Sequence, residues 1–185
     1  MKRIVLVFLL VWMGLLQGVN AQDQSRAIDM AIYVEAPLAA VWNAWTTEEG
    51  VKTFFAPDAN IDLRVGGAYE LYFNPKARPG MRGSEGCVIL AIEPMKMLSF
   101  TWNAPPDMPE IRKQKTHVTV RFSQATERSV KVSIYHDGWG EGEQWDRAYE
   151  YFKKTWREVV LPRLVYSFAV EPIIWEDPQI PVSRK

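Results

Sequence analysis

Two histidines, His117 and His136, are the side chains of this chain best suited to acid–base chemistry near neutral pH. His136 continues an alternation of apolar residues that begins at Val130, so we expect it on the inner face of a strand, near the start of a long helix. There it would orient a polar group of a ligand or act as a general base. The alternative is that it bonds the backbone where the strand meets the helix. His117 falls on the opposite, solvent-facing side of its strand, which argues against a metal site shared by the two histidines.

A set of aromatic side chains is the second feature with chemical potential. Aromatic rings can line a site for a flat apolar ligand, although the same pattern is typical of a packed core. We predict ligand contact in a cavity, and no catalytic role, for a set that also includes His136. Its members are Tyr69, Phe73, Trp102, His136, Trp139, Trp145, Tyr149, Phe152 and Trp156.

Other groups of reactive or binding type have simpler interpretations. Glu141, Glu143 and Asp146 cluster at the start of the predicted long helix, where they complement the positive end of its dipole. The glycines of 138–142 lack the Lys-Ser/Thr pair or the βαβ context of a phosphate-binding loop. Cys87 lies in an apolar stretch, where a lone thiol is usually buried and unreactive. One cysteine with two histidines also makes structural zinc improbable, so we predict neither a metal nor a cofactor.

Composition narrows the class of protein further. The 185 residues contain 22 basic and 22 acidic side chains, so no basic excess exists to bind nucleic acid. With 48% hydrophobic and 12% aromatic residues, the chain can fold around a core as one domain.

The first residues have the pattern of an export signal. Lys2 and Arg3 precede an apolar run, 4–16, that is too short to cross a bilayer as a helix. The run is followed by small residues ending at Ala21, after which we expect cleavage. An uncleaved anchor or a buried N-terminal helix is the alternative. We therefore expect a periplasmic or secreted protein without a stable membrane anchor, consisting of a signal peptide at 1–21, a domain at 28–168 and a proline-rich tail at 169–185.

The elements that would position these side chains follow from hydrophobic periodicity. After the first strand, Pro37 suits the first turn of a short helix to Trp45, and Thr47 can cap a second one running to about Phe55. Glycines at 66–67 would turn a hairpin, and the prolines of 105–109 indicate a loop. The predicted strands are 28–35, 61–65, 69–73, 87–92, 98–102, 117–122 and 130–136.

A helical period begins at about residue 142. Its apolar stripe contains Trp145, Tyr149, Phe152, Trp156, Val159 and Leu164. Pro162 should kink the helix, and the residues from 171 on read as an extended tail. The order predicts an α+β fold in which a curved antiparallel sheet of about six or seven strands wraps around the long C-terminal helix. A cavity tends to remain between such a sheet and its helix, although a fully packed core is the alternative.

Several short sequence motifs, taken in their order along the chain, resemble those of one superfamily. They are Val34-Glu35-Ala36-Pro37, Val41-Trp42-Asn43-Ala44-Trp45-Thr46, Gly66-Gly67-x-Tyr69-Glu70, Glu93-Pro94-x-Lys96-x-Leu98-x-Phe100-x-Trp102, and His136-x-Gly138-Trp139 followed by Trp145-Asp146. Together they resemble the SRPBCC (START-like, helix-grip) superfamily over about residues 28–165. The greatest similarity is to the C-terminal domain of the activator of heat-shock protein 90 ATPase.

The resemblance implies a helix-grip fold with a cavity under the long helix. Members of the superfamily bind apolar ligands, act as polyketide cyclases or, in the eukaryotic namesake, serve as a co-chaperone. The first expectation is an exported protein that binds a small apolar or amphipathic ligand without catalysis. One alternative is a cavity enzyme of the cyclase or hydrolase kind that uses His136. The other is a protein-interaction or co-chaperone-like module that uses loop 104–110 and tail 171–185. The oligomeric state stays open.

Overall fold

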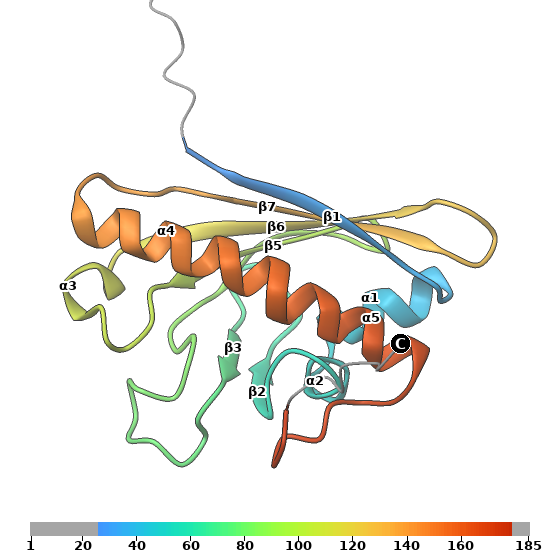
Figure 1. Ribbon diagram of the computed structural model, residues 1–185, viewed down its shortest axis with the longest axis horizontal. Helices are drawn as coiled ribbons and strands as arrows, with labels where there is room; N and C mark the ends of the chain where they lie inside the picture. Colours follow the sequence, from blue (N-terminus) through green and yellow to red (C-terminus); the bar gives the residue numbers. More distant parts are fainter. Residues whose placement is uncertain (1–25, 179–185) are drawn as a thin grey trace, which may run out of the picture.

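The structure, a computed structural model, describes residues 26–178, so the predicted signal peptide at 1–21 lies outside the described residues. Seven strands form two sheets, a five-stranded antiparallel sheet in the order β1-β7-β6-β5-β4 and a hairpin of β2 and β3 (Figure 1). The strands are β1 (Ile28–Val34), β2 (Asp58–Ile61), β3 (Tyr69–Tyr72), β4 (Ile89–Glu93), β5 (Met97–Asn103), β6 (Lys115–Gln124) and β7 (Val130–Asp137). The predicted α+β class and helix-grip arrangement are confirmed.

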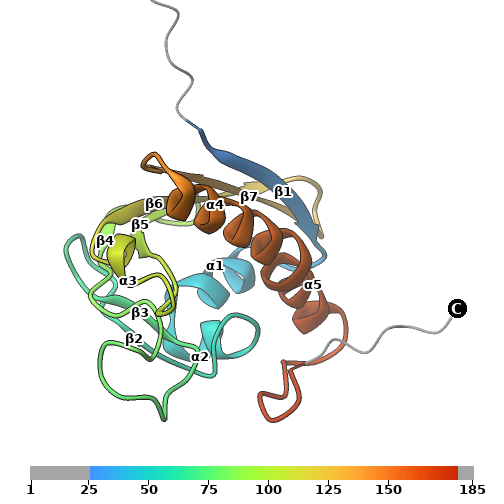
Figure 2. The same cartoon turned by 60° about the vertical axis from the view of Figure 1, so that its left-hand side comes forward.

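Alternation along the strands decides which face is covered by the helix. In β6 and β7 the apolar positions from Val118 and Val130 onward are buried, while their neighbours are half-buried or exposed. His136 shares the buried face, and in the register of β1 and β7 it lies opposite Ile28. Figure 2 shows the sheet curving over one side of the long helix. The core therefore lies between the inner face of the sheet and the helix.

Two short helices follow β1, as the sequence predicts. They are α1 (Leu38–Thr46) and α2 (Glu48–Lys52). The side chain of Thr47 accepts a hydrogen bond from the backbone N–H of Gly50, which is the expected N-cap of the second helix. α1 buries Trp42 and Trp45, so the two short helices close one end of the core.

The long C-terminal helix is continuous over 27 residues but changes its winding in the middle. It consists of α4 (Glu143–Thr155), a π-helical turn η1 (Trp156–Val160) and α5 (Leu161–Ala169). The N–H of Leu161 donates to the carbonyl of Trp156, five residues earlier, one residue before Pro162. The helix thus accommodates Pro162 with a π turn in place of the predicted kink. The extra residue in this turn also shifts the buried face of the helix, so that Val160 is buried and Val159, which was predicted on the apolar stripe, is only half-buried. Within residues 26–178, no helix combines the length and apolarity needed to cross a membrane.

The hairpin differs from the sequence prediction. The strand predicted at 61–65 is wrong for all but its first residue, because β2 ends at Ile61. Beyond it the backbone turns tightly, with the N–H of Arg64 donating to the carbonyl of Asp62 and that of Gly67 donating to Arg64. A side chain at Gly67 would lie 2.1 Å from the Asp62 carbonyl oxygen, so the turn requires glycine there. The apolar residues that suggested a strand, Leu63 and Val65, are exposed.

Two further segments acquire structure that periodicity does not predict. The end of the proline-rich loop winds into a short helix, α3 (Pro109–Arg112), which begins with proline. After α5 the chain returns to the end of α2, where the backbone N–H of Ile173 donates to Thr53 and the indole N–H of Trp175 donates to Lys52. The guanidinium of Arg163 lies 5.4 Å from the centre of the Trp175 ring. The tail is therefore packed on the domain as far as residue 178.

Candidate functional site

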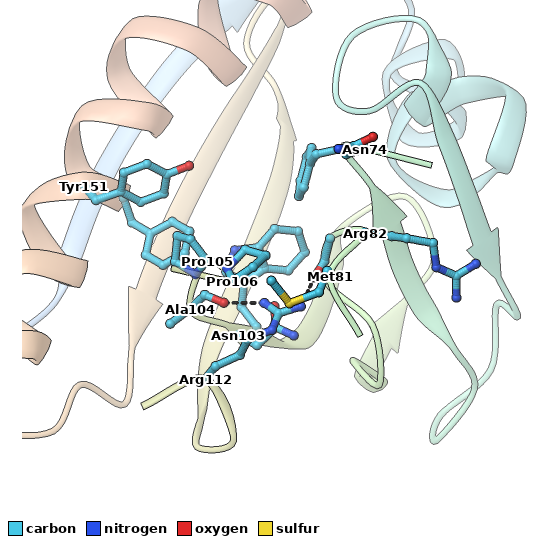
Figure 3. Close-up of a pocket in the computed structure, with 13 residues that line it drawn as sticks. Asn74, Met81, Arg82, Asn103, Ala104, Pro105, Pro106, Arg112 and Tyr151 are labelled. Carbon is cyan, nitrogen blue, oxygen red and sulfur yellow. Dashed lines mark hydrogen bonds between the residues drawn. The ribbon is translucent and has the colours of Figure 1, made fainter. Parts of the chain in front are cut away.

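A pocket of about 330 Å³ opens beside α4, where the helix faces the end of β5 and the loop after β3 (Figure 3). Its size falls in the range of small-molecule sites. The lining residues are Phe73, Asn74, Met81, Arg82, Gly83, Trp102, Asn103, Ala104, Pro105, Pro106, Arg112, Tyr151 and Phe152. The lining thus combines aromatic side chains with polar and basic ones.

The aromatic wall is held by the core behind it. Trp102 is buried and stacks on Phe55, with 5.8 Å between the ring centres. Phe73 meets Trp102 edge to face at 6.2 Å and is 48% exposed, so it stands at the mouth of the pocket. Phe152 is buried, and its neighbour Tyr151 is exposed at the rim. The pocket therefore offers a rigid inner wall and a more open outer edge.

Arg112, at the end of α3, organises the polar wall. Its guanidinium donates hydrogen bonds to the carbonyl oxygens of Ala104, Gly80 (3.0 Å) and Gly83 (2.6 Å). Burial lowers the pKa of Arg112, but the group remains a cation because its ordinary pKa is so high. A side chain at Gly83 would lie 1.9 Å from the Leu71 carbonyl oxygen, so the loop can approach β3 only with glycine at this position.

Glu85 fixes the loop between β3 and β4 that forms this side of the pocket. Its carboxylate accepts hydrogen bonds from the backbone N–H groups of Gly80 (2.7 Å) and Arg82 (2.8 Å) and from the Arg82 side chain (2.8 Å). Burial alone would raise the pKa of Glu85, but these hydrogen bonds stabilise the anion and bring the pKa below its ordinary value. The loop is thus held in one conformation by a charged group.

His136 lies in the core behind the pocket and is completely buried. Its Nδ1 accepts a hydrogen bond from the indole N–H of Trp156 at 3.1 Å, so the neutral ring carries its proton on Nε2. Nε2 then donates to Oγ1 of Thr116 at 2.8 Å, and the Thr116 hydroxyl donates to the Trp102 carbonyl at 3.2 Å. Burial, with a smaller contribution from the charge of His117, lowers the pKa of His136 from 6.5 to about 3. The ring is therefore neutral at physiological pH, with both nitrogens engaged.

This network confirms the inward orientation of His136 and corrects the bond expected for it. The partners of the ring are two side chains, those of Thr116 and Trp156, and not the backbone at the strand-to-helix turn. The backbone there is used differently, because the carbonyl of His136 accepts from the indole N–H of Trp139. His117 is exposed on the other face of the sheet, as expected, with Nδ1 3.4 Å from the Asp137 carboxylate.

The structure brings three of the nine predicted ligand contacts, Phe73, Trp102 and Phe152, to the pocket. The other six lie elsewhere in the fold. Tyr69 is buried, and its hydroxyl donates to the carbonyl of Trp45. Burial raises the Tyr69 pKa above its ordinary value.

The remaining predicted residues pack around the long helix. His136 and Trp156 form the core network described above, and Trp139 packs on the His136 ring at 4.3 Å. Trp145 belongs to a second buried cluster that includes Ile111 of α3 and the preceding residue Met108. Tyr149 donates through its hydroxyl to the carbonyl of Ala27 at 3.1 Å, which ties the start of β1 to α4.

The pocket residues that come from loop 74–83 and from α3 were not predicted from the sequence. Asn74, Met81 and Arg82 come from a loop, and Arg112 comes from a single helical turn, so none lies on a periodic face that could reveal it.

Cys87 is buried as predicted, and burial raises the pKa of its thiol, although the Lys115 ammonium lies 3.6 Å from Sγ. Across the described part of the chain, no three His, Cys, Asp or Glu side chains are grouped so as to hold a metal ion.

Comparison with known proteins gives a family match and several structural matches. Residues 35–165 match the family described as Activator of Hsp90 ATPase homolog 1-like protein, which confirms the resemblance seen in the sequence. A crystal structure of a Mesorhizobium loti protein is 22% identical, with a TM-score of 0.58, over 75% of this chain and 93% of that one. An HSP90 activator from Plasmodium falciparum is 19% identical, with a TM-score of 0.57, over 75% and 92%.

The Aha1 dimer from Colwellia psychrerythraea is similar to the same extent. It is 18% identical, with a TM-score of 0.57, over 79% of this chain and 98% of that one. At these identities the likeness establishes the fold. Among curated proteins none matches the chain.

Proposed function

Because the chain belongs to the family of Activator of Hsp90 ATPase homolog 1-like proteins, we propose that it binds a small apolar or amphipathic ligand in the pocket beside α4. The observation that carries this proposal is the aromatic wall of Phe73, Trp102 and Phe152 around about 330 Å³ of open space. Burying an apolar group against such a wall releases water from both surfaces and favours binding. The wall is already in place before a ligand arrives, so little ordering opposes it.

Binding without catalysis is favoured by the state of His136. A general base needs a nitrogen lone pair within reach of its substrate. The Nδ1 lone pair of His136 accepts the Trp156 indole N–H, and the ring is not among the pocket-lining side chains. Its place in the network supports the pocket wall at Trp102 instead.

Uptake of a neutral fluorophore tests this function. N-phenyl-1-naphthylamine should gain fluorescence with the purified protein, and native mass spectrometry of protein taken from its natural source should detect a copurified small molecule. Phe73→Ala should weaken uptake about tenfold, because it removes part of the aromatic contact area. Tyr33→Ala, which removes an aromatic ring 58% exposed on β1, should leave uptake unchanged. No uptake by the wild type, or equal losses in the two variants, would refute the proposal.

We also propose that the protein is exported and that its signal peptide is removed after Ala21. The support is the basic start, the short apolar run 4–16 and the small residues before position 22. The intact mass of the protein from its natural source tests this, since a mature chain beginning at Gln22 is expected. A mass that includes residues 1–21 would refute cleavage.

A further inference from the structure

We propose that the ligand of this pocket carries one anionic head group, such as a carboxylate or sulfonate, placed against Arg112 while its apolar part lies along Trp102 and Phe152. This inference rests on the proposed function and assigns the chemical class of the ligand. Figure 3 shows Arg112 beside Met81 and Tyr151 on the opposite side of the pocket, while the guanidinium of Arg82 points away from it.

The charge of Arg112 is only partly compensated. Its side chain is 13% exposed, and the carboxylate nearest to it within the described chain is that of Glu85, at 4.0 Å. Glu85 in turn makes a shorter contact of 2.8 Å with Arg82, so one carboxylate serves two guanidinium groups. The three carbonyl oxygens on Arg112 supply dipoles but no formal negative charge. A half-buried cation without a full counter-charge is costly, and an anion in the pocket would reduce that cost.

The wider surroundings of the pocket are basic as well. Segments 74–86 and 103–115, which supply most of the lining, contain six basic residues and three acidic ones, a net charge of +3. The full chain has a net charge of 0, so these two segments are more basic than the chain as a whole. Of their charged residues, Arg82 and Arg112 line the pocket. A concave site with one sign of charge raises the local concentration of ligands of the opposite sign.

The apolar wall restricts the ligand further. A small inorganic anion would leave Trp102 and Phe152 in contact with water, whereas a neutral hydrocarbon would leave Arg112 without a counter-charge. A molecule with one anionic end and an apolar body satisfies both walls. The volume of about 330 Å³ limits that body to a small one.

A matched pair of probes tests the charge directly. N-phenyl-1-naphthylamine is neutral, and 8-anilinonaphthalene-1-sulfonate has the same rings with one sulfonate. The wild type should bind the sulfonate about tenfold more tightly, a ratio typical of one charge-assisted hydrogen bond, and added salt should reduce the ratio.

Two variants at Met81 test whether the preference for the sulfonate depends on the charge of Arg112. Met81→Glu adds a carboxylate near Arg112, Met81→Gln is its neutral control, and neither removes a contact of Arg112. Met81 lines the pocket and lies in the segment between Gly80 and Gly83, whose carbonyl oxygens accept from Arg112. Met81→Glu should abolish the preference for the sulfonate, because the new carboxylate supplies the missing counter-charge. Met81→Gln has nearly the same shape and should keep the preference. Thermal unfolding of each variant shows whether the loop is intact, and the wild-type salt series decides the matter if either variant fails to fold.

The outcomes separate this inference from the proposed function. Uptake of both probes with equal affinity would overturn the anionic head group and leave ligand binding standing. Failure of both probes would overturn ligand binding itself. Equal behaviour of Met81→Glu and Met81→Gln, with the preference retained in both, would show that the sulfonate is bound elsewhere and would overturn the assignment to Arg112.

Discussion

Acidification should destabilise the fold through His136, and the loss of stability should begin at a pH above the ordinary pKa values of carboxylates. In the unfolded chain this histidine titrates near 6.5, whereas burial brings its pKa in the folded protein to about 3. Between these values the unfolded chain binds a proton that the folded protein does not. The His136 contribution to stability is therefore fully present above about pH 6.5 and is lost as the pH falls toward 3.

The size of the effect follows from the width of this window. Well between the two pKa values each pH unit costs about 1.4 kcal/mol, and near pH 6.5 it costs about half as much because the unfolded histidine is then only half protonated. The free energy of unfolding should therefore fall by about 2 kcal/mol between pH 6.5 and pH 4.5. Glu70 and Glu85 have folded pKa values below the ordinary 4.5, so their contributions are lost only as the pH falls below this range. Above about pH 5 the histidine should therefore dominate the pH dependence.

Urea unfolding followed by tryptophan fluorescence, at several pH values across this interval, measures the effect. His136→Gln keeps a polar side chain that can bond Thr116 and Trp156 but cannot titrate, so its stability should be nearly independent of pH from 6.5 to 4.5. His117→Gln replaces the other histidine of the chain and removes only the smaller cause of the low His136 pKa, so it should keep most of the wild-type dependence. Parallel curves for the wild type and His136→Gln would refute the reasoning, because the proton would then be taken up elsewhere.

Two further predictions concern the core network and the pocket loop. Trp156→Phe removes the donor to Nδ1 of His136 and should lower the free energy of unfolding by about 1–3 kcal/mol, as measured by the urea midpoint; an unchanged midpoint would mean that the buried nitrogen finds another donor. Gly83→Ala places a methyl group against the Leu71 carbonyl oxygen and should displace the pocket loop, so uptake of N-phenyl-1-naphthylamine should fall while the circular dichroism of the sheet persists. Undiminished uptake by Gly83→Ala would contradict the placement of this loop in the pocket wall.

The fold was largely predictable because burial leaves a clear period in the sequence. The alternation from Val118 to Phe122 and from Val130 to His136 gave the central strands, and Thr47 was recognised as a cap by its side-chain type and place. Alternation fails where exposed residues happen to be apolar, as at Leu63 and Val65. It cannot foresee a π turn either, because the cost of Pro162 can be met in several ways.

The site was less predictable than the fold. Periodicity correctly gave Trp102 and Phe152 inward directions but cannot distinguish a side chain that lines a pocket from one that fills the core. Trp156 illustrates the difference, since it has the same helical pattern and is 2% exposed within the core. The place of Arg112 in the pocket depends on its contacts with Gly80 and Gly83, 32 and 29 residues earlier in the chain, and no local pattern predicts such contacts.

Hydrogen bonds between residues far apart in the sequence determine when the domain can complete its folding. β1 is an edge strand that pairs with β7, and the carbonyl of Ala27 bonds Tyr149, 122 residues later. Trp175 bonds Lys52 across 123 residues. A chain made at about 5–20 residues per second exposes its first strand for several seconds before either partner exists. Contacts of such long range also slow folding relative to a helical bundle, so the domain closes only when its last helix has been made.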